Sequence, residues 1–243
     1  MRILSAHGSV DRACQVARTR GWIRDAEHLL VLTGAGISTD SGIPAPTGRE
    51  AIDWTANAPG RRRVWRALAH FLRAGRPNAG HHALADLERA GRLGALVTQN
   101  VDGLHLVAGN SRRRLIEYHG DRRVAMCLAC GSRIPTHLVL DVVEAGNDDP
   151  RCVCGGILRP AVLSGTGEVD PEAHTRAISA ARRTDLLLAV GTTLSRFPVA
   201  GLARLAAARG RLVIVNRSPT RLDGIADVVL RGSISEVLPQ LVV

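Results

Sequence analysis

Short apolar runs that alternate with helical segments constrain the fold of this chain more than any other feature of its sequence. The runs lie at His28–Thr33, Leu93–Thr98, Leu186–Val190, Leu212–Val215 and Asp227–Leu230. They are short, rich in branched side chains and often followed by glycine or a small polar residue, which is typical of buried parallel strands. Segments with helical spacing lie at Val10–Ala26, Val64–Arg73, His82–Ala90, Pro171–Ala181 and Pro198–Ala208. The alternation predicts an α/β fold with a Rossmann-like, doubly wound parallel sheet.

Two stretches interrupt this alternation. Gly42–Pro77 is loop-rich and then helical, and Arg122–Pro160 holds four of the five cysteines. We expect both on the ligand-binding side of the sheet. The predicted organisation is one domain over residues 1–243: a Rossmann-like core at about 1–44, 78–121 and 161–243, a helical and loop insertion at about 45–77, and a cysteine-rich zinc module at about 122–160.

The net charge of +10 comes from a chain whose basic residues are all arginine, and only 2% of its residues are aromatic. Nucleic-acid grooves usually interleave basic and aromatic residues, so we expect no specific nucleic-acid partner. The runs Arg61–Arg63 and Arg112–Arg114 are interpreted as solvated faces. No apolar run approaches the roughly 20 residues that span a bilayer, so no membrane partner is expected. We read the arginine-rich start as an amphipathic helix rather than a transit peptide, and expect a cytoplasmic protein.

The first apolar run ends in Thr33-Gly34-Ala35-Gly36-Ile37-Ser38-Thr39. Glycines here let the backbone turn tightly and approach a pyrophosphate, whose charge backbone amides and a following helix would meet. A purely structural turn needs the same glycines, and that alternative stays open. The acidic residue that dehydrogenases carry about 20 positions further on is not evident, so a dinucleotide would be held differently.

Polar residues also follow the later runs, at strand ends that face the ligand crevice of such a sheet. Gln99, Asn100 and Asp102 could bind ribose hydroxyls and a carboxamide, or they could form a turn that caps a helix. His119, between Tyr118 and Gly120, is a candidate for proton transfer or an ordinary structural histidine. The remaining strand-end residues suited to phosphate and ribose are Gly191, Thr192, Thr193, Asn216, Arg217 and Ser218.

The paired cysteines indicate a metal site. Cys127-x-x-Cys130 is followed by Cys152-x-Cys154 and two glycines, a pattern suited to tetrahedral Zn²⁺ bound by four thiolates. Four thiolates leave no open coordination position, so the metal would be structural. Disulfides are the competing interpretation, but a reducing compartment disfavours them. The second pair is one residue shorter than the common knuckle, which would strain the site. Cys14 is expected to be a buried apolar residue.

Taken in order, these motifs resemble the sirtuin (Sir2-like) family of NAD-dependent protein deacylases. Gly34–Pro44 is similar to the family's opening motif. The other motifs follow in the family's order: Thr98–His105, Tyr118–Gly120, the four cysteines, Leu158–Pro160, Gly191–Leu194 and Asn216. The segment Val97–Gly120 is most similar to the branch that contains the mitochondrial lipoamidase-type sirtuins.

The resemblance implies a single sirtuin-type catalytic domain that removes acyl groups from protein lysines and gives nicotinamide and O-acyl-ADP-ribose. NAD would be the co-substrate, one Zn²⁺ structural, and an acylated-lysine protein or peptide the partner, added as a strand between the zinc module and the core. His119 would be the general base, with Asn100 and Asp102 as the other catalytic residues. The implied NAD-binding residues are Gly34, Ala35, Gly36, Ser38, Thr39, Ile43, Pro44, Gln99, Asn100, Asp102, Gly191, Thr192, Thr193, Asn216, Arg217, Ser218 and Ile234. The resemblance does not define an oligomeric state.

Three departures from the family pattern qualify this prediction. Ala45-Pro46-Thr47 stands where the family has Asp-Phe/Tyr-Arg, and Arg159–Glu168 is one residue longer than its counterpart and lacks a phenylalanine. The Tyr-x-x-Arg pair that marks selectivity for acidic acyl groups is absent from Val64–Arg73. The altered loop leaves two alternatives open: an NAD hydrolase or ADP-ribosyltransferase, and a non-catalytic NAD-binding sensor.

Overall fold

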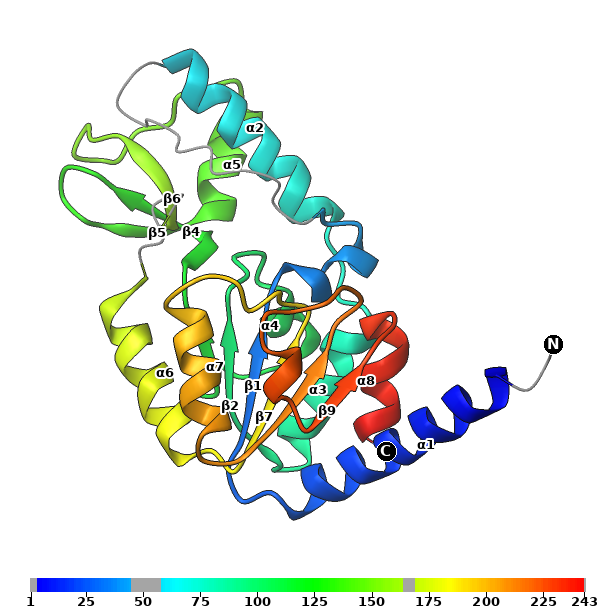
Figure 1. The fold of residues 1–243 in the computed structure, drawn as a ribbon. Helices are drawn as coiled ribbons and strands as arrows, with labels where there is room; N and C mark the ends of the chain where they lie inside the picture. The colour runs from blue at the N-terminus through cyan, green and yellow to red at the C-terminus, as the bar shows by residue number, and fades with distance from the viewer. Residues whose placement is uncertain (1–3, 45–57, 164–168, 243) are drawn as a thin grey trace.

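A parallel sheet lies at the centre of the larger part of the molecule (Figure 1). The structure is a computed structural model that describes residues 4–44, 58–163 and 169–242. Within them the sheet has six strands in the order β3-β2-β1-β7-β8-β9. Their bounds are β1 (Leu29–Thr33), β2 (Leu93–Thr98), β3 (Leu115–Glu117), β7 (Leu186–Val190), β8 (Arg211–Val215) and β9 (Val228–Leu230). The chain winds outward in both directions from the adjacent pair β1 and β7, so the predicted doubly wound sheet is confirmed.

Helices cover both faces of this sheet. Along β1, Leu29 and Val31 face one apolar core and Leu30 and Leu32 face the other, because side chains alternate along a strand. The first core is completed by α1 (Leu4–Asp25), α3 (Ala79–Arg89) and α8 (Ile234–Val242), and the second by α6 (Pro171–Arg183) and α7 (Val199–Ala207). Burial on both faces explains why the strands are continuous apolar runs.

A smaller antiparallel sheet forms the second part of the molecule, in the order β5-β4-β6. Its strands are β4 (Gly120–Cys127), β5 (Arg133–Pro135) and β6 (Leu158–Val162), and it packs with α5 (Thr136–Glu144). Helix α2 (Ala58–Ala74) lies against it and contributes the fully buried Trp65 to a separate apolar core. Figure 1 shows α2 and this sheet together at one end of the parallel sheet.

Several short elements were not predicted from the sequence. Strand β3 and helix α4 (Leu104–Ala108) are too short to show a clear period, and α8 contains Pro239, which argues against a helix in sequence terms. The prediction that Cys14 is buried is wrong: Val16 and Ile23 of α1 are buried, whereas Cys14 projects from another side of the helix and is exposed. No helix in the described ranges is long and apolar enough to cross a membrane.

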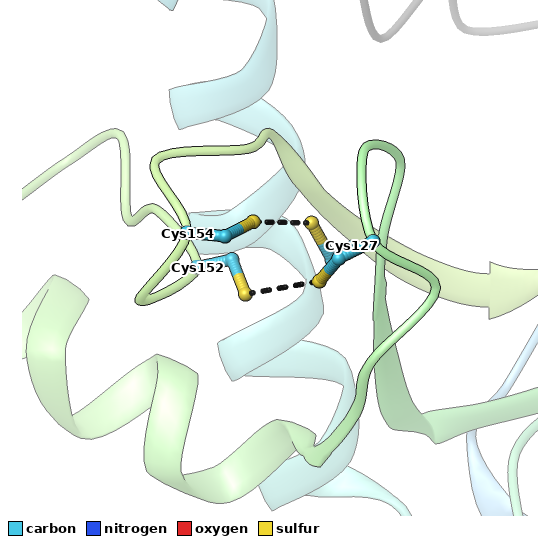
Figure 2. Close-up of side chains that lie close together, drawn as sticks. Cys127, Cys152 and Cys154 are labelled. Carbon is cyan, nitrogen blue, oxygen red and sulfur yellow. Dashed lines mark hydrogen bonds between the residues drawn. The ribbon is translucent and has the colours of Figure 1, made fainter.

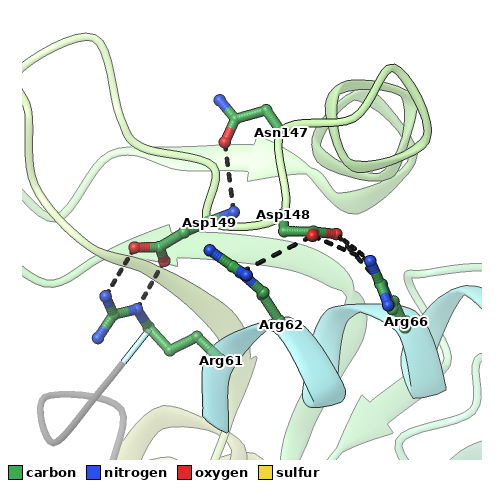
Figure 3. A network of polar contacts seen from close by, with 6 residues as sticks. All are labelled: Arg61, Arg62, Arg66, Asn147, Asp148 and Asp149. Atoms are coloured by element: carbon green, nitrogen blue, oxygen red, sulfur yellow. Dashed lines mark hydrogen bonds and ion pairs between the residues drawn. The ribbon is translucent and has the colours of Figure 1, made fainter. Parts of the chain in front are cut away.

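The sequence analysis interpreted the run Arg61–Arg63, on α2, as a solvated face. The structure shows that this interpretation is wrong for Arg61. Arg61 is buried and makes a two-pronged ion pair with Asp149, with Nε–Oδ1 and Nη2–Oδ2 distances of 2.6 and 2.7 Å. One turn on, Arg66 donates to Asp148, and Arg62 lies 3.8 Å from the same carboxylate (Figure 3). The prediction failed because the aspartates lie far away in sequence, in the loop before Cys152.

Candidate active site and metal centre

A cavity of about 690 Å³ opens at the carboxyl ends of β1, β2, β7 and β8, where ligands bind in doubly wound sheets. Its volume lies in the range of small-molecule sites, roughly 300–1,000 Å³. Every residue that the sequence analysis assigned to NAD or to catalysis lines it: Gly34, Ala35, Gly36, Ser38, Thr39, Ile43, Pro44, Gln99, Asn100, Asp102, His119, Gly191, Thr192, Thr193, Asn216, Arg217, Ser218 and Ile234. The altered loop Ala45–Thr47 lies outside the described residues.

The floor of the cavity is formed by two glycine loops in direct contact. The Gly34 and Gly36 amides donate to the carbonyl oxygens of Val190 and Gly191 at 3.1 and 2.8 Å. A Cβ atom on Gly36 would lie 2.8 Å from Gly191 Cα, so the contact requires a glycine. The helix expected after this loop is instead a pair of short 3₁₀ turns, η1 (Ala35–Ile37) and η2 (Thr39–Ser41). Short turns rather than a long helix therefore follow the glycine loop at the floor of the cavity.

Gly191→Ala is expected to lower the free energy of unfolding by about 2–5 kcal/mol, since left-handed backbone and overpacking both oppose a side chain there. Gly191 has φ +63°, and an added Cβ would lie 2.4 Å from the Ile37 nitrogen. Gly42 is the matched control, because it has φ +77° with nothing within 4 Å of an added Cβ. Urea denaturation of both variants gives the comparison. Equal losses would show that the contact between the loops is not tight.

A chain of hydrogen bonds orients the polar side chains after β2. The Asn100 side-chain amide donates to Gly34 O at 3.2 Å and to Ser38 Oγ at 3.1 Å, and the Ser38 hydroxyl donates to Asp102 Oδ2 at 2.7 Å. Asp102 Oδ1 accepts the Leu104 amide at 2.9 Å. Asp102 therefore holds the turn before α4 and also lines the cavity.

Gln99, at the end of β2, is hydrogen-bonded to the last residue of β1 and to the segment that follows β7. Its side-chain amide donates to Thr192 Oγ1 at 2.9 Å and to the Thr33 carbonyl oxygen at 3.3 Å. The ends of β1, β2 and β7 are therefore held together by side chains as well as by the sheet.

Buried neutral groups lie below this polar layer. His105 Nε2 lies 2.9 Å from the Thr33 hydroxyl, and its ring centroid is 5.0 Å from that of His81. Burial lowers the pKa of His105 well below its ordinary value and lowers the pKa of His81 to about 4. Both rings are therefore uncharged at neutral pH.

His119 follows β3 and lines the cavity with its backbone held in place. Its carbonyl oxygen accepts the Leu163 amide at 3.0 Å, just after β6. The neighbouring Tyr118 is fully buried, packs edge-on against the His119 ring, and hydrogen-bonds to His174 Nδ1 through its hydroxyl. Burial raises the pKa of Tyr118 to about 12, so the tyrosine stays neutral. His119 is thus the histidine that the structure places at the cavity wall.

The cavity also includes residues that were not assigned individually to NAD or to catalysis: Asp40, Phe71, Val101, Leu194, Ser195, Arg196, Val199 and Gly232. Ser195 and Arg196 continue the motif after β7, where the rule that strand ends face the crevice applies to them as well. Asp40 accepts from the Ser233 hydroxyl at 2.7 Å and from Arg217 at 3.4 Å, contacts that join distant segments. Phe71 comes from α2, and no sequence pattern around it indicates that it lines the cavity.

The four paired cysteines converge at one point in the small sheet. Their sulfur atoms all lie within 4.8 Å of one another, with Cys127–Cys154 at 3.6 Å and Cys130–Cys152 at 3.7 Å (Figure 2). Tetrahedral Zn²⁺ with bonds of about 2.3 Å places its sulfur ligands roughly 3.8 Å apart. The four sulfurs therefore fit one structural Zn²⁺, and the short Cys-x-Cys spacing does not prevent it.

The electrostatics of the four thiols also suit a cation. Hydrogen bonds with Ser132 lower the pKa of Cys130 to about 6. A hydrogen bond from the Gly156 amide lowers the pKa of Cys154, but Cys130, Cys127 and Cys152 together raise it to about 12. Four thiols this close cannot all ionise alone because the thiolates repel one another, whereas a bound dication offsets that repulsion.

Fold and site together define an α/β protein with a nucleotide-sized cavity at the switch point of its sheet and a separate four-cysteine metal centre. The sequence model of the Sir2 family matches residues 47–198 of this chain. A relative named NAD-dependent protein deacetylase 2, from Streptomyces coelicolor, is 43% identical over 87% of this chain and 95% of its own. The NAD-dependent protein deacetylase of Haloarcula marismortui is 41% identical over 90% of each chain. The chain belongs to the Sir2 family and is a sirtuin.

Solved sirtuin structures share the fold. A structure described as Sir2 bound to acetylated peptide has a TM-score of 0.83 and 29% identity, covering 93% of this chain and 96% of that one. Another, described as Sir2Tm bound to a propionylated peptide, has a TM-score of 0.82 at the same identity and coverage. The fold of most of the chain is therefore shared with these structures.

Proposed function

We propose that this sirtuin removes acyl groups from protein lysine side chains in an NAD-dependent reaction. The observation that carries the proposal is the single cavity that gathers the glycine loops, the Asn100–Ser38–Asp102 chain and His119. Acyl-lysine, NAD and water would give lysine, nicotinamide and O-acyl-ADP-ribose. One amide bond and one glycosidic bond break, one ester bond forms, and water is consumed.

The cavity residues fit a dinucleotide by the chemistry of their donors and acceptors. We assign the pyrophosphate to the loops Gly34–Gly36 and Gly191–Thr193, where small residues let the ligand approach backbone amides. Gln99 and the loop Asn216–Ser218 would bind ribose hydroxyls, and Ile43, Pro44 and Asp102 would hold the nicotinamide carboxamide. Bound NAD supplies an electrophilic ribose carbon and nicotinamide as the leaving group.

The protein's own contribution to the reaction is positioning and proton transfer. A ring nitrogen of His119 would accept a proton from a ribose hydroxyl as the general base. Asn100, fixed by Gly34 and Ser38, would orient the ribose and a water molecule. The apolar cavity residues Leu194, Val199 and Phe71 would keep bulk water away from the reacting groups.

Incubation with NAD and a library of acyl-lysine peptides, followed by mass spectrometry, is expected to give O-acyl-ADP-ribose in equal amount to free lysine peptide. The expectation follows because acyl transfer and nicotinamide release are coupled in this reaction. ADP-ribose formed without peptide would support the NAD hydrolase or ADP-ribosyltransferase alternative. Unchanged NAD, together with a rise in melting temperature on NAD addition, would support the sensor.

Three finer assignments are also proposals. The sequence of Val97–Gly120 supports placement in the branch with lipoamidase-type sirtuins, whereas the relatives named above are a bacterial and an archaeal deacetylase. A lipoyl-lysine peptide in the library tests that placement. The division into core, helical insertion and zinc module is supported by the separate apolar cores. A cytoplasmic location is supported by the thiolate chemistry of the metal centre, which suits a reducing compartment.

A further inference from the structure

Phe71 gives the cavity an aromatic wall that comes from outside the parallel sheet. Phe71 lies on α2 and is the one phenylalanine among the cavity-lining residues that the structure describes. The guanidinium carbon of Arg122, on β4, lies 4.7 Å from the centre of this ring. The contact is a cation–π interaction. It places a positive charge against a residue of the cavity wall, although Arg122 itself is not among the lining residues.

The guanidinium of Arg122 makes no ion pair within 4.0 Å in the described part of the chain. Its backbone amide donates to the Val101 carbonyl oxygen at 3.2 Å, but its side chain makes neither an ion pair nor a hydrogen bond there. The next residue is the contrast: the Arg123 guanidinium donates to Asp121 at 2.8 Å and to Glu117 at 3.1 Å.

Arg122 is also partly buried, and burial lowers its pKa. The nearby carboxylate of Asp102 raises that pKa, but its oxygens already accept hydrogen bonds from Ser38 and Leu104. A half-buried guanidinium without an acceptor is costly in free energy, and an incoming anion relieves that cost. Because the guanidinium is a planar fork of donors, it fits the paired oxygens of a carboxylate, as it would those of a phosphate.

We propose that Arg122, held against Phe71, makes the cavity selective for acyl groups that end in a carboxylate, with succinyl-lysine as the representative substrate. The proposal rests on the deacylase function proposed above. The aliphatic part of the acyl chain packs on the Phe71 ring, and its carboxylate meets the guanidinium. Val64–Arg73 lacks the Tyr-x-x-Arg pair associated with acidic acyl groups. In this chain β4 supplies the charge instead of α2.

The test compares a succinyl-lysine peptide with a butyryl-lysine peptide of the same sequence, which has four acyl carbons but no carboxylate. Affinity is measured by fluorescence anisotropy in the presence of NAD, and kcat/KM by mass spectrometry. Wild type is expected to prefer the succinyl peptide. Arg122→Gln should weaken succinyl binding and kcat/KM by ~10- to 100-fold, the range expected for a charge-assisted hydrogen bond, and leave butyryl values nearly unchanged.

Two further variants sharpen the comparison. Arg122→Lys keeps the charge but loses the planar fork, so it should retain part of the succinyl preference. Phe71→Leu keeps an apolar wall but removes the cation–π contact, and should reduce the preference by roughly 2- to 5-fold. Arg133→Gln is the charge-matched control, because Arg133 is exposed on β5 away from the cavity. A zinc content and a melting temperature equal to those of wild type establish that a variant is folded. If Arg122→Gln does not fold, the comparison of wild type with Arg122→Lys provides the test.

The inference is overturned if wild type shows no succinyl preference, or if Arg122→Gln lowers both peptides alike. Turnover of the butyryl peptide would then leave the deacylase function standing. If neither peptide is turned over and the acyl-lysine library gives no O-acyl-ADP-ribose, the deacylase proposal fails. The binding data alone then decide whether Arg122 recognises the carboxylate.

Discussion

His119→Ala should slow deacylation by ~10²–10⁴-fold in single-turnover experiments, the usual contribution of a positioned general base. His119 lines the cavity, and its backbone is held by the Leu163 amide, so the substitution removes the ring without moving the loop. Rapid quench of enzyme with bound acyl peptide and NAD gives the rate of ester formation directly. The loss should lie in this rate and not in the affinity for NAD.

His137→Ala is the matched control, because His137 is an exposed histidine on α5. It should behave as wild type. Wild-type rates in His119→Ala would remove His119 from the mechanism. Equal inactivity of wild type and His119→Ala, with NAD still bound, would favour the sensor alternative.

Loss of zinc should unfold the metal module, since the binding free energy of a structural zinc, ~10–16 kcal/mol in small zinc domains, is also folding free energy. Cys130→Ser is expected to reduce bound zinc from one equivalent to well below half, measured by elemental analysis of fresh protein. Cys127 and Cys152 belong to the same apolar core as Trp65, so the damage should spread into α2. Hydrogen exchange should report loss of protection in β4, β5, β6, α5 and α2.

Cys14→Ser provides the control for this experiment, because Cys14 is an exposed cysteine on α1. It should keep its zinc and its exchange pattern. A Cys130→Ser protein with a full equivalent of zinc, or with normal protection in the small sheet, would contradict a four-cysteine structural site.

The strands of the parallel sheet were the most predictable elements, and the reason is physical. The predicted bounds of β2 and β7 match the structure at both ends, because each strand is buried and a polar or glycine residue follows it. β3 is three residues long and α8 contains a proline, so neither has a pattern that a local rule detects. The small sheet was foreseen only as a cysteine-rich module, since its strands are short and irregular.

The residues of the candidate site also differ in how well they could be predicted from the sequence. Residues directly after strands, such as Asn100 and Asn216, could be predicted to line the cavity because parallel strands present their carboxyl ends at one edge. Phe71 and Arg122 could not, since their contact joins a helix and a strand about fifty residues apart in sequence and depends on how the two parts pack. For the same reason the burial of Arg61 against Asp149 was not foreseen.

Helix α2 contacts both the metal module and the cavity. Through Trp65 and the Arg61–Asp149 ion pair it is bound to the metal module, while Phe71 near its other end lines the cavity. If the module rotates relative to the parallel sheet, α2 turns with it as one rigid body. The glycine floor stays with the sheet. Such a hinge motion would therefore alter the space for the acyl group while leaving the phosphate-binding loops unchanged, so substrates of different size could share one dinucleotide geometry.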